Sequence, residues 1–374
     1  MKKLLHAQTI SGTIRDLKIS EPIVFSDNEK KKRSGHMSHA MACFDEGKII
    51  DFYSNCSNLR CYGHEAYGWV EYKISEDYGK TFGRAKKFKF SWDTLLAGEH
   101  TVSVEKVVSP QKNILVAFCL MNSQFTALSC EPWDKPQIAI SKDGGKTWTD
   151  PYVLCEHQGR IYDATYYNGS IFALEFCNPA ADTFLGSKPE HVYRLYRSDD
   201  NGESFYEVCV VPFPDTKNRG YGNMIFTPEG KLIVYTYNYA DEVNMDCAIS
   251  SDLGKTWDEI GKSYVAKKIR NPQVGLLDGQ FILHGRSGGW EDAGFVFYTS
   301  ADGVHWDEGQ ELIKGKTACF YSNNLTITGS DGKERMLVQY SENISGNEKV
   351  EEGCWPSQVN AMHLWIESVE NEEK

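Results

Sequence analysis

The sequence lacks any long apolar run. No stretch of about 18 consecutive apolar residues occurs in the 374-residue chain, so no membrane-spanning helix is predicted. The first five residues, Met1-Lys2-Lys3-Leu4-Leu5, begin like a secretory signal, but His6-Ala7-Gln8-Thr9 follow before an apolar core can form. The 11 cysteines are odd in number, scattered and without C-x-x-C spacing, which is typical of reduced thiols. These absences predict a cytoplasmic protein without a membrane partner.

The sequence also lacks an excess of positive charge. Its formal net charge is −12, which argues against nonspecific binding to nucleic acid. No segment has a convincing helical pattern, and no Pro-, Gly- or Ser-rich linker divides the chain. A single domain over residues 1–374 is therefore expected, and no cofactor is indicated.

What the chain does contain is a repeated turn, Ser-x-Asp-x-Gly-x-Thr/Ser-aromatic. An Asp side chain accepts hydrogen bonds from nearby backbone N–H groups, and Gly supplies a left-handed conformation. The motif is thus interpreted as a β-hairpin turn that marks the fold and lies away from the chemistry. Full copies occupy residues 75–82, 141–148, 198–205 and 250–257, and a copy shortened by one residue occupies 300–306.

The spacing of these turns predicts the architecture. Their Asp residues stand at 77, 143, 200, 252 and 302, and a repeat near 50 residues built of strands is typical of propeller blades. A second repeat, two apolar runs joined by a tight turn, lies out of phase with the first. Such hairpins are a strong local signal. The six copies lie near residues 41–51, 102–120, 164–176, 224–237, 274–283 and 325–340.

Together the two repeats predict an all-β, six-bladed β-propeller of four-stranded antiparallel blades. Each hairpin would form the inner pair of strands, and the Asp-containing turn would join the outer pair. The last blade is expected to close with residues 358–367 and with N-terminal strands, because open sheet edges would otherwise remain.

The segments just before the six hairpins should meet at one mouth of the central channel. Polar and aromatic groups converging on one concave site are the usual sign of an active or binding site. The candidates from these segments are His36, His39, Glu99, His100, Arg160, Asp163, Tyr221, Asn223, Arg270 and Tyr321. Each also has a structural interpretation; Arg160 and Arg286, for example, would pair with Glu175 or Asp163.

Five Asp-containing turns in a six-hairpin chain resemble the Asp boxes of the sialidase (neuraminidase) superfamily, over about residues 35–367. Residues 320–325 resemble the Tyr-Ser-x-Leu segment of that family, which implies that Tyr321 is a nucleophile. Residues 277–286 resemble a hairpin that ends in an arginine of the carboxylate-binding triad, here Arg286. Residues 336–342, ending in Glu342, resemble a later Leu-Tyr-Glu stretch.

Two departures from the family pattern stand out. The Phe/Tyr-Arg-Ile-Pro motif of the first blade is absent, and residues 34–39 (Ser-Gly-His-Met-Ser-His) take its place. Residues 224–238 lack the Glu and Arg of a typical fourth blade. The full set of three arginines, an aspartate and a Tyr/Glu pair therefore cannot be assigned.

Chemically, the predicted function is exo hydrolysis of a glycoside of an acidic, sialic-acid-like sugar. Such hydrolysis needs an acid on one face of the bond and a nucleophile or base on the other. Glu99 and Asp163 are the candidate carboxylates, with Tyr321 as nucleophile and Glu342 as its base. The substrate carboxylate would bind the three arginines at 160, 270 and 286. Tyr221 and Trp290 would stack on the sugar. Further contacts would come from His36, His39 and Asn223.

Two other functions remain open. A lyase on uronate polymers would use His36, His39 or His100 as base together with Tyr321 and arginine. A glycan-binding propeller without catalysis would keep the aromatic rings and arginines. Three histidines also suggest zinc, but His36 and His39 would lie on opposite faces of a strand, so no metal site is predicted.

Overall fold

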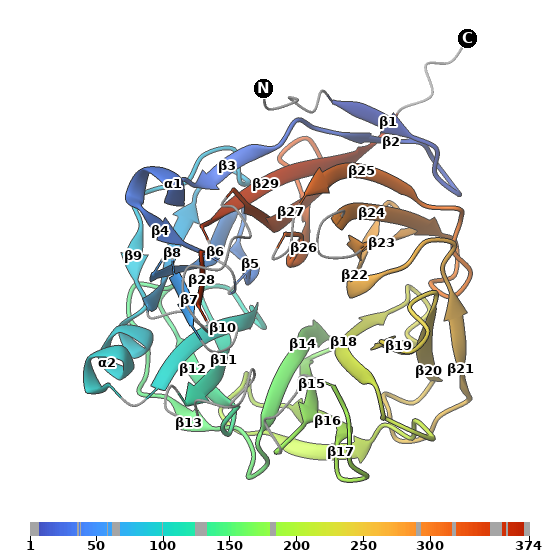
Figure 1. The fold of residues 1–374 in the computed structure, drawn as a ribbon, viewed down its shortest axis with the longest axis horizontal. Coiled ribbons are helices and arrows are strands. Elements are labelled where there is room, and N and C mark those ends of the chain that lie inside the picture. The colour runs from blue at the N-terminus through green and yellow to red at the C-terminus, as the bar shows by residue number, and fades with distance from the viewer. Residues whose placement is uncertain are drawn as a thin grey trace.

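The structure is a computed structural model. It describes residues 7–35, 37, 39–57, 59–61, 68–98, 100–123, 133–179, 185–288, 293–315, 319–344, 354–356 and 358–369. Six antiparallel blades are arranged around a central axis (Figure 1). Inner strands of neighbouring blades are in contact around the whole ring, and the innermost strand of the last blade contacts that of the first. The chain is therefore a six-bladed, all-β propeller, as predicted.

Four of the blades are regular four-stranded sheets whose strands follow the order of the chain. The second blade holds β10 (His100–Val108), β11 (Leu115–Ser123), β12 (Gln137–Ser141) and β13 (Tyr152–Val153). The third holds β14 (Gly159–Tyr167), β15 (Ser170–Cys177), β16 (Val192–Ser198) and β17 (Tyr206–Val210). The fourth holds β18 (Arg219–Phe226), β19 (Leu232–Asn238), β20 (Asn244–Ser250) and β21 (Glu259–Tyr264). The fifth holds β22 (Arg270–Leu277), β23 (Gln280–Ser287), β24 (Ala293–Ser300) and β25 (Gln310–Gly315).

The first and last blades are larger because the chain ends there. The first contains β4 (Arg33–Ser34), β5 (Met41–Asp45), β6 (Lys48–Ser57), β8 (Gly68–Ser75) and β9 (Lys86–Lys87). The last contains β26 (Ser322–Thr328), β27 (Glu334–Asn343) and β29 (Val359–Ser368), joined by the N-terminal β1 (Gln8–Ile10), β2 (Leu17–Ile19) and β3 (Ile23–Ser26). A small separate sheet pairs β7 (Leu59–Cys61) with β28 (Cys354–Pro356). Because β2 and β3 both pair with β29, the N-terminus closes the ring as expected.

The Asp-containing turns join the third and fourth strands of their blades. In the turn after β12, the Asp143 carboxylate accepts hydrogen bonds from Thr147 N (2.9 Å) and Thr147 Oγ1 (2.6 Å). Ser141 Oγ donates to Asp143 Oδ1 at 2.9 Å and accepts from Gly145 N at 2.8 Å. These polar groups of the turn are therefore hydrogen-bonded to one another within the motif.

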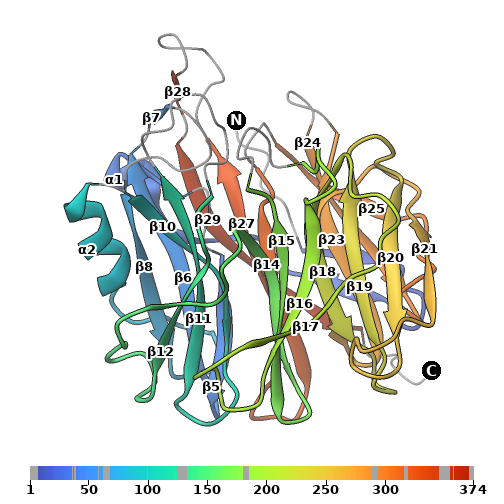
Figure 2. The ribbon, with the colours of Figure 1, turned by 90° about the horizontal axis from the view of Figure 1, so that it is seen from below.

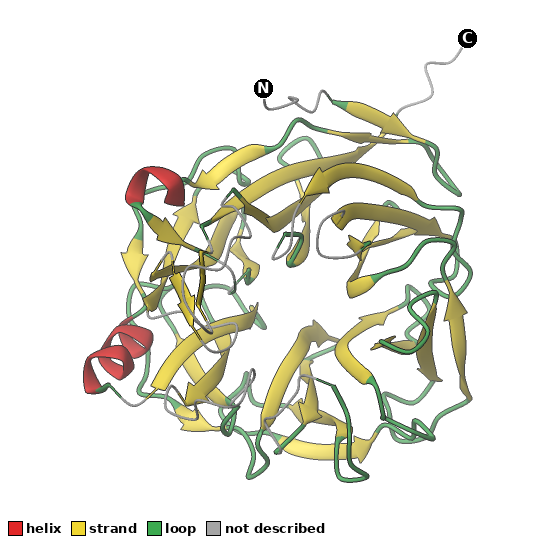
Figure 3. Cartoon of the chain, viewed as in Figure 1, coloured by secondary structure: helices red, strands yellow, loops and turns green. Residues whose placement is uncertain are grey.

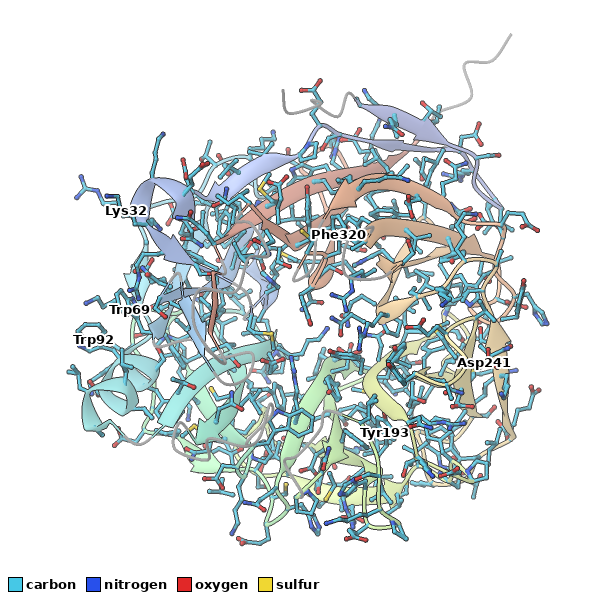
Figure 4. All side chains as sticks on the ribbon, viewed as in Figure 1. Lys32, Trp69, Trp92, Tyr193, Asp241 and Phe320 are labelled. Carbon is cyan, nitrogen blue, oxygen red and sulfur yellow. The ribbon has the colours of Figure 1, made fainter. Side chains whose placement is uncertain are left out.

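Each of these turns also contacts the preceding blade. Tyr72 of the first blade donates its hydroxyl to the Gly145 carbonyl at 2.7 Å, and Tyr235 of the fourth blade donates to the Gly303 carbonyl at 2.5 Å. The ring of Trp148 lies 5.2 Å from that of Phe88 and 5.8 Å from that of Phe52. The terminal aromatic residue thus packs between blades. Figure 4 labels two further buried rings, Tyr193 and Phe320.

Two short helices, α1 (Asn28–Lys31) and α2 (Lys89–Ala97), lie at the outer rim (Figure 3). The prediction that no helix forms is wrong here. Helix α2 begins without a side-chain cap, and it is held instead by buried Ser91, whose hydroxyl accepts from Val70 N at 2.9 Å. This tertiary contact has no local signal in the sequence. Within the described ranges, no helix is long and apolar enough to cross a membrane.

Candidate functional site

The inner strands of the second to fifth blades each carry a β-bulge, and these bulges build the candidate site. The register shifts between Val104 and Lys106, Ile161 and Asp163, Gly220 and Gly222, and Arg270 and Gln273. A bulge turns its extra residue away from the regular alternation of the strand. The inner strands that carry these bulges contact one another from blade to blade, and Figure 2 shows the blades from the side. The extra residues are Glu105, Tyr162, Tyr221 and the pair Asn271-Pro272.

A row of tyrosines connects three blades on this face. The Tyr221 ring lies 5.6 Å from that of Tyr162 and 6.5 Å from that of Tyr321, in edge-to-face geometry. The Tyr237 ring lies 5.7 Å from that of Tyr221. Tyr221 has a φ of +50°, a conformation that bulky residues rarely adopt and that is concentrated at functional sites. The fold thus brings the predicted Tyr321 and Tyr221 together.

Two arginines flank this row. Arg270 and Arg286 are opposite each other on β22 and β23. The guanidinium carbon of Arg286 lies 5.5 Å from the centre of the Tyr321 ring, and that of Arg270 lies 5.6 Å from the Tyr237 ring. Arg286 is only 7% exposed, and its buried Nε has no hydrogen-bond partner among the described residues. A largely buried guanidinium that has a donor without a partner is a position where an anionic ligand can be held.

Arg270 keeps its charge although it is half-buried. Burial works against the cation, but neighbouring Tyr221, Tyr237 and Glu242 raise the pKa of Arg270 above its ordinary value. Tyr237 also donates its hydroxyl to Glu242 at 2.7 Å. Two cations therefore stand beside the tyrosine row.

Arg160, by contrast, is already neutralised. Its Nε and one terminal nitrogen donate to Glu105 Oε2 at 3.0 and 2.6 Å, and Ser103 donates to the other oxygen at 2.7 Å. The guanidinium lies over the Tyr162 ring at 4.9 Å. The expected partners, Glu175 and Asp163, are not the ones that the structure provides. Sequence reasoning missed Glu105, for which the only signal was a single acidic residue within an apolar strand.

Asp163 lies in a buried network on the inner wall. Its carboxylate receives Lys106 Nζ at 3.0 Å, Asn223 Nδ2 at 2.7 Å and Met224 N at 2.8 Å. Lys106 also donates to Gln273 Oε1 at 2.9 Å and Asn323 Oδ1 at 2.8 Å. The predicted acid and the predicted ligand-binding Asn223 are therefore engaged with each other.

His284 borders the same network and is neutral. Burial, with the nearby charge of Lys106, lowers the pKa of His284 to about 3. Its Nδ1 lies 3.0 Å from Ser322 Oγ and its Nε2 lies 3.0 Å from Asn324 Nδ2. Its neutral imidazole ties the fifth blade to the sixth.

The remaining predicted residues are placed as follows. His39 is buried just before β5. Glu342 is half-buried on β27. Burial raises the pKa of Tyr340, and the charge of Glu342 raises it further. His100 begins β10, and its backbone pairs with Ser123. His36, Glu99 and Trp290 lie outside the described residues. The binding or catalytic roles expected of these residues therefore stay predictions.

The part of the chain that the structure describes contains no group of three or more His, Cys, Asp or Glu side chains arranged to hold a metal ion. Eight of its cysteines are free thiols: Cys43, Cys56, Cys119, Cys155, Cys177, Cys209, Cys247 and Cys319.

The chain has the fold of a sialidase-like, six-bladed propeller. A protein of unknown function from Dyadobacter fermentans superposes with a TM-score of 0.68 at 16% identity, covering 94% of this chain and 99% of the other. A Hadza microbial sialidase gives 0.64 at 13% identity, covering 86% and 66%. The Trypanosoma rangeli sialidase bound to the inhibitor DANA gives 0.61 at 12% identity, covering 93% and 59%. The chain thus spans about three fifths to two thirds of these sialidases. No protein-family model and no curated protein matches the sequence.

Proposed function

We propose that this protein is a glycosidase that removes a terminal acidic, sialic-acid-like sugar at the tyrosine row. The observation that carries the proposal is the pair formed by Tyr321 and Arg286. A carboxylated sugar would place its anion against the guanidinium of Arg286, with Arg270 as a second cation. That position sets the ring carbons of the sugar beside Tyr321.

A tyrosine suits such a substrate as nucleophile. A carboxylate nucleophile would be repelled by the anionic sugar, whereas a neutral hydroxyl is not, and sialidases are the known glycosidases that use Tyr. The likeness in fold to the Trypanosoma rangeli enzyme, which was solved in complex with sialic acid, supports this choice. Glu99 remains the proposed acid, since both oxygens of Asp163 are hydrogen-bonded in the network.

The test compares aryl sialosides, aryl uronides and neutral aryl glycosides as substrates. Tyr321→Phe should reduce kcat on the sialoside by ~10³-fold or more, because the nucleophile is lost. Arg286→Lys should reduce kcat/KM by ~10²-fold, because an ammonium cannot form the planar two-point contact. The matched controls are Tyr206→Phe and Arg194→Lys on the outer strands β16 and β17.

A wild-type protein that cleaves none of these substrates would reject the glycosidase proposal. Full activity in Tyr321→Phe would reject Tyr321 as the nucleophile. Release of an unsaturated product, seen by its ultraviolet absorbance, would favour a lyase.

A glycan-binding propeller without catalysis is the second candidate. It is favoured by the engagement of Asp163 with Lys106 and of Arg160 with Glu105, which leaves fewer free groups than a catalytic set requires. In that case, a sialylated oligosaccharide should bind equally well to wild type and Tyr321→Phe, and Arg286→Lys alone should weaken binding.

A further inference from the structure

A cavity lies on the face of the propeller opposite to the tyrosine row. The tyrosines stand at the beginnings of the inner strands, whereas this cavity lies between the Asp-containing turn of the first blade and the hairpin turn that ends β26. It has a volume of about 340 Å³ and is lined by Tyr78, Lys80 and Trp365, among others. A more polar cavity of about 640 Å³ adjoins it and shares Arg335 and Glu367. These volumes are in the range of small-molecule binding sites.

Two aromatic rings from opposite ends of the chain line the cavity. Tyr78 has a φ of +61° in the turn, and Gly144, Asn201 and Leu253 have a positive φ at the same position of the next three turns. The left-handed backbone therefore belongs to the turn itself, and the aromatic side chain at this position is what distinguishes the turn of the first blade. The Tyr78 hydroxyl donates to Glu46 at 3.0 Å, which fixes the ring. Trp365 contacts Gly79, where an added Cβ would come within 3.0 Å of the indole.

The polar side of the cavity is a fixed ionic cluster. Arg335 donates Nε to Glu367 at 3.0 Å and its two terminal nitrogens to Asp331 at 2.9 and 2.6 Å. The Asp331 and Glu367 side chains are 47% and 45% exposed, so their outer lone pairs face solvent. With Lys80 beside them, two cations balance two carboxylates.

We propose that this cavity binds a neutral oligosaccharide. The C–H faces of a sugar pack well on Tyr and Trp rings, and its hydroxyls donate to carboxylates and accept from Lys and Arg. The balanced charge gives no preference for an anion, in contrast to the two arginines beside Tyr321. The adjoining cavity gives room for further sugar units of the same chain.

The experiment measures binding of cellotriose, maltotriose, chitotriose and sialyllactose by saturation-transfer NMR and calorimetry. At least one neutral trisaccharide should bind, at ~1 mM or tighter. Tyr78→Gly should weaken that binding by ~10-fold or more. This variant removes the ring and relieves the strained φ, so the turn should still form. Asn201→Gly, the same change in the turn of the third blade, should leave binding unaltered.

Three results would overturn the proposal: no neutral trisaccharide binds at ~10 mM, Tyr78→Gly binds as wild type does, or the acidic sialyllactose binds this face most tightly. The Arg286→Lys variant separates the two sites. This variant should still bind the neutral trisaccharide but should no longer bind sialyllactose. If the function proposed at Tyr321 is wrong, binding of the neutral trisaccharide should be unaffected.

Discussion

Lys106 and Asp163 form a buried ion pair on the inner wall, and their side chains are only 10% and 7% exposed. Removing one member of such a pair leaves a buried charge without its partner, which costs about 3–5 kcal/mol. We therefore expect Lys106→Met to lower the free energy of unfolding by about that amount, measured by urea denaturation.

The double variant Lys106→Met with Asp163→Asn should recover much of the loss, since no buried charge remains. The control is Lys112→Met, which removes an exposed lysine from Asp45 and should change stability little. Equal effects of the two single substitutions would contradict the buried network.

Glu175 gives a prediction of pH dependence. It is fully buried, and burial raises its pKa to about 7, although Tyr196 donates to it at 2.9 Å and Cys155 at 3.4 Å. An acid whose pKa is raised on folding contributes stability that is fully present below the unfolded pKa of 4.5 and is lost as pH rises through about 7. The change across this window is about 3 kcal/mol.

Glu175→Gln should remove this dependence, so that its unfolding free energy falls less than that of wild type between pH 4.5 and 7. Chemical denaturation at several pH values measures it, with the exposed Glu203→Gln as control. Parallel pH profiles for wild type and Glu175→Gln would contradict the assignment.

At the scale of single residues, only part of the candidate site could be predicted from the sequence. Tyr321, Tyr221 and Arg270 were proposed because strand beginnings in a propeller converge, whereas Arg286 was proposed from the resemblance of its hairpin to that of sialidases. Glu105 and Tyr162 were missed because a bulge is a property of two paired strands and has no local marker. Which carboxylate neutralises Arg160 depends on the distance between blades, which no single segment encodes.

At the scale of the element, the Asp-containing turn is a self-sufficient unit, and this is why it could be predicted. Asp143, Ser141 and Thr147 satisfy one another within eight residues of chain. Helix α2 shows the opposite case: it lacks a capping side chain, and its position depends on Ser91 bonding to a distant strand.

Asp143→Ala should therefore destabilise the second blade. The hydrogen bonds of Thr147, Ser141 and Lys146 overcome the effect of burial and lower the pKa of Asp143 to about 2. Its contribution is present above the unfolded pKa of 3.8 and is lost as pH falls towards 2. A decrease of about 1 kcal/mol or more at pH 7 is expected.

Thermal unfolding at pH 7 and at pH 3 checks this, with Asp150→Ala just beyond the turn as control. The difference between wild type and Asp143→Ala should shrink at the lower pH. A constant difference would mean that the carboxylate charge has no part in the turn.

For the whole molecule, the stability of the ring depends on how its ends are joined. The N-terminal strands β2 and β3 cover β29, and β29 in turn pairs with β27. An uncovered sheet edge would leave backbone groups unpaired, so the last blade must be closed by further strands. This is why residues 358–367 could be predicted to belong to the last blade. The partner strands could not be paired residue by residue from the sequence, because three short N-terminal strands offer many registers.

Closure can be tested at Ile19, which is fully buried, pairs with Ile366, and belongs to the core of the last blade. An aspartate there would bury an unpaired charge or detach β2, at a cost of about 3 kcal/mol or more. Ile14→Asp is the matched control, since Ile14 is 48% exposed in the same segment. Ile19→Asp should lower the Tm and, because β29 then presents an open edge, produce concentration-dependent association in size-exclusion chromatography. Association in both variants would trace the effect to added charge, and a monomeric, stable Ile19→Asp would show that the ring holds without β2.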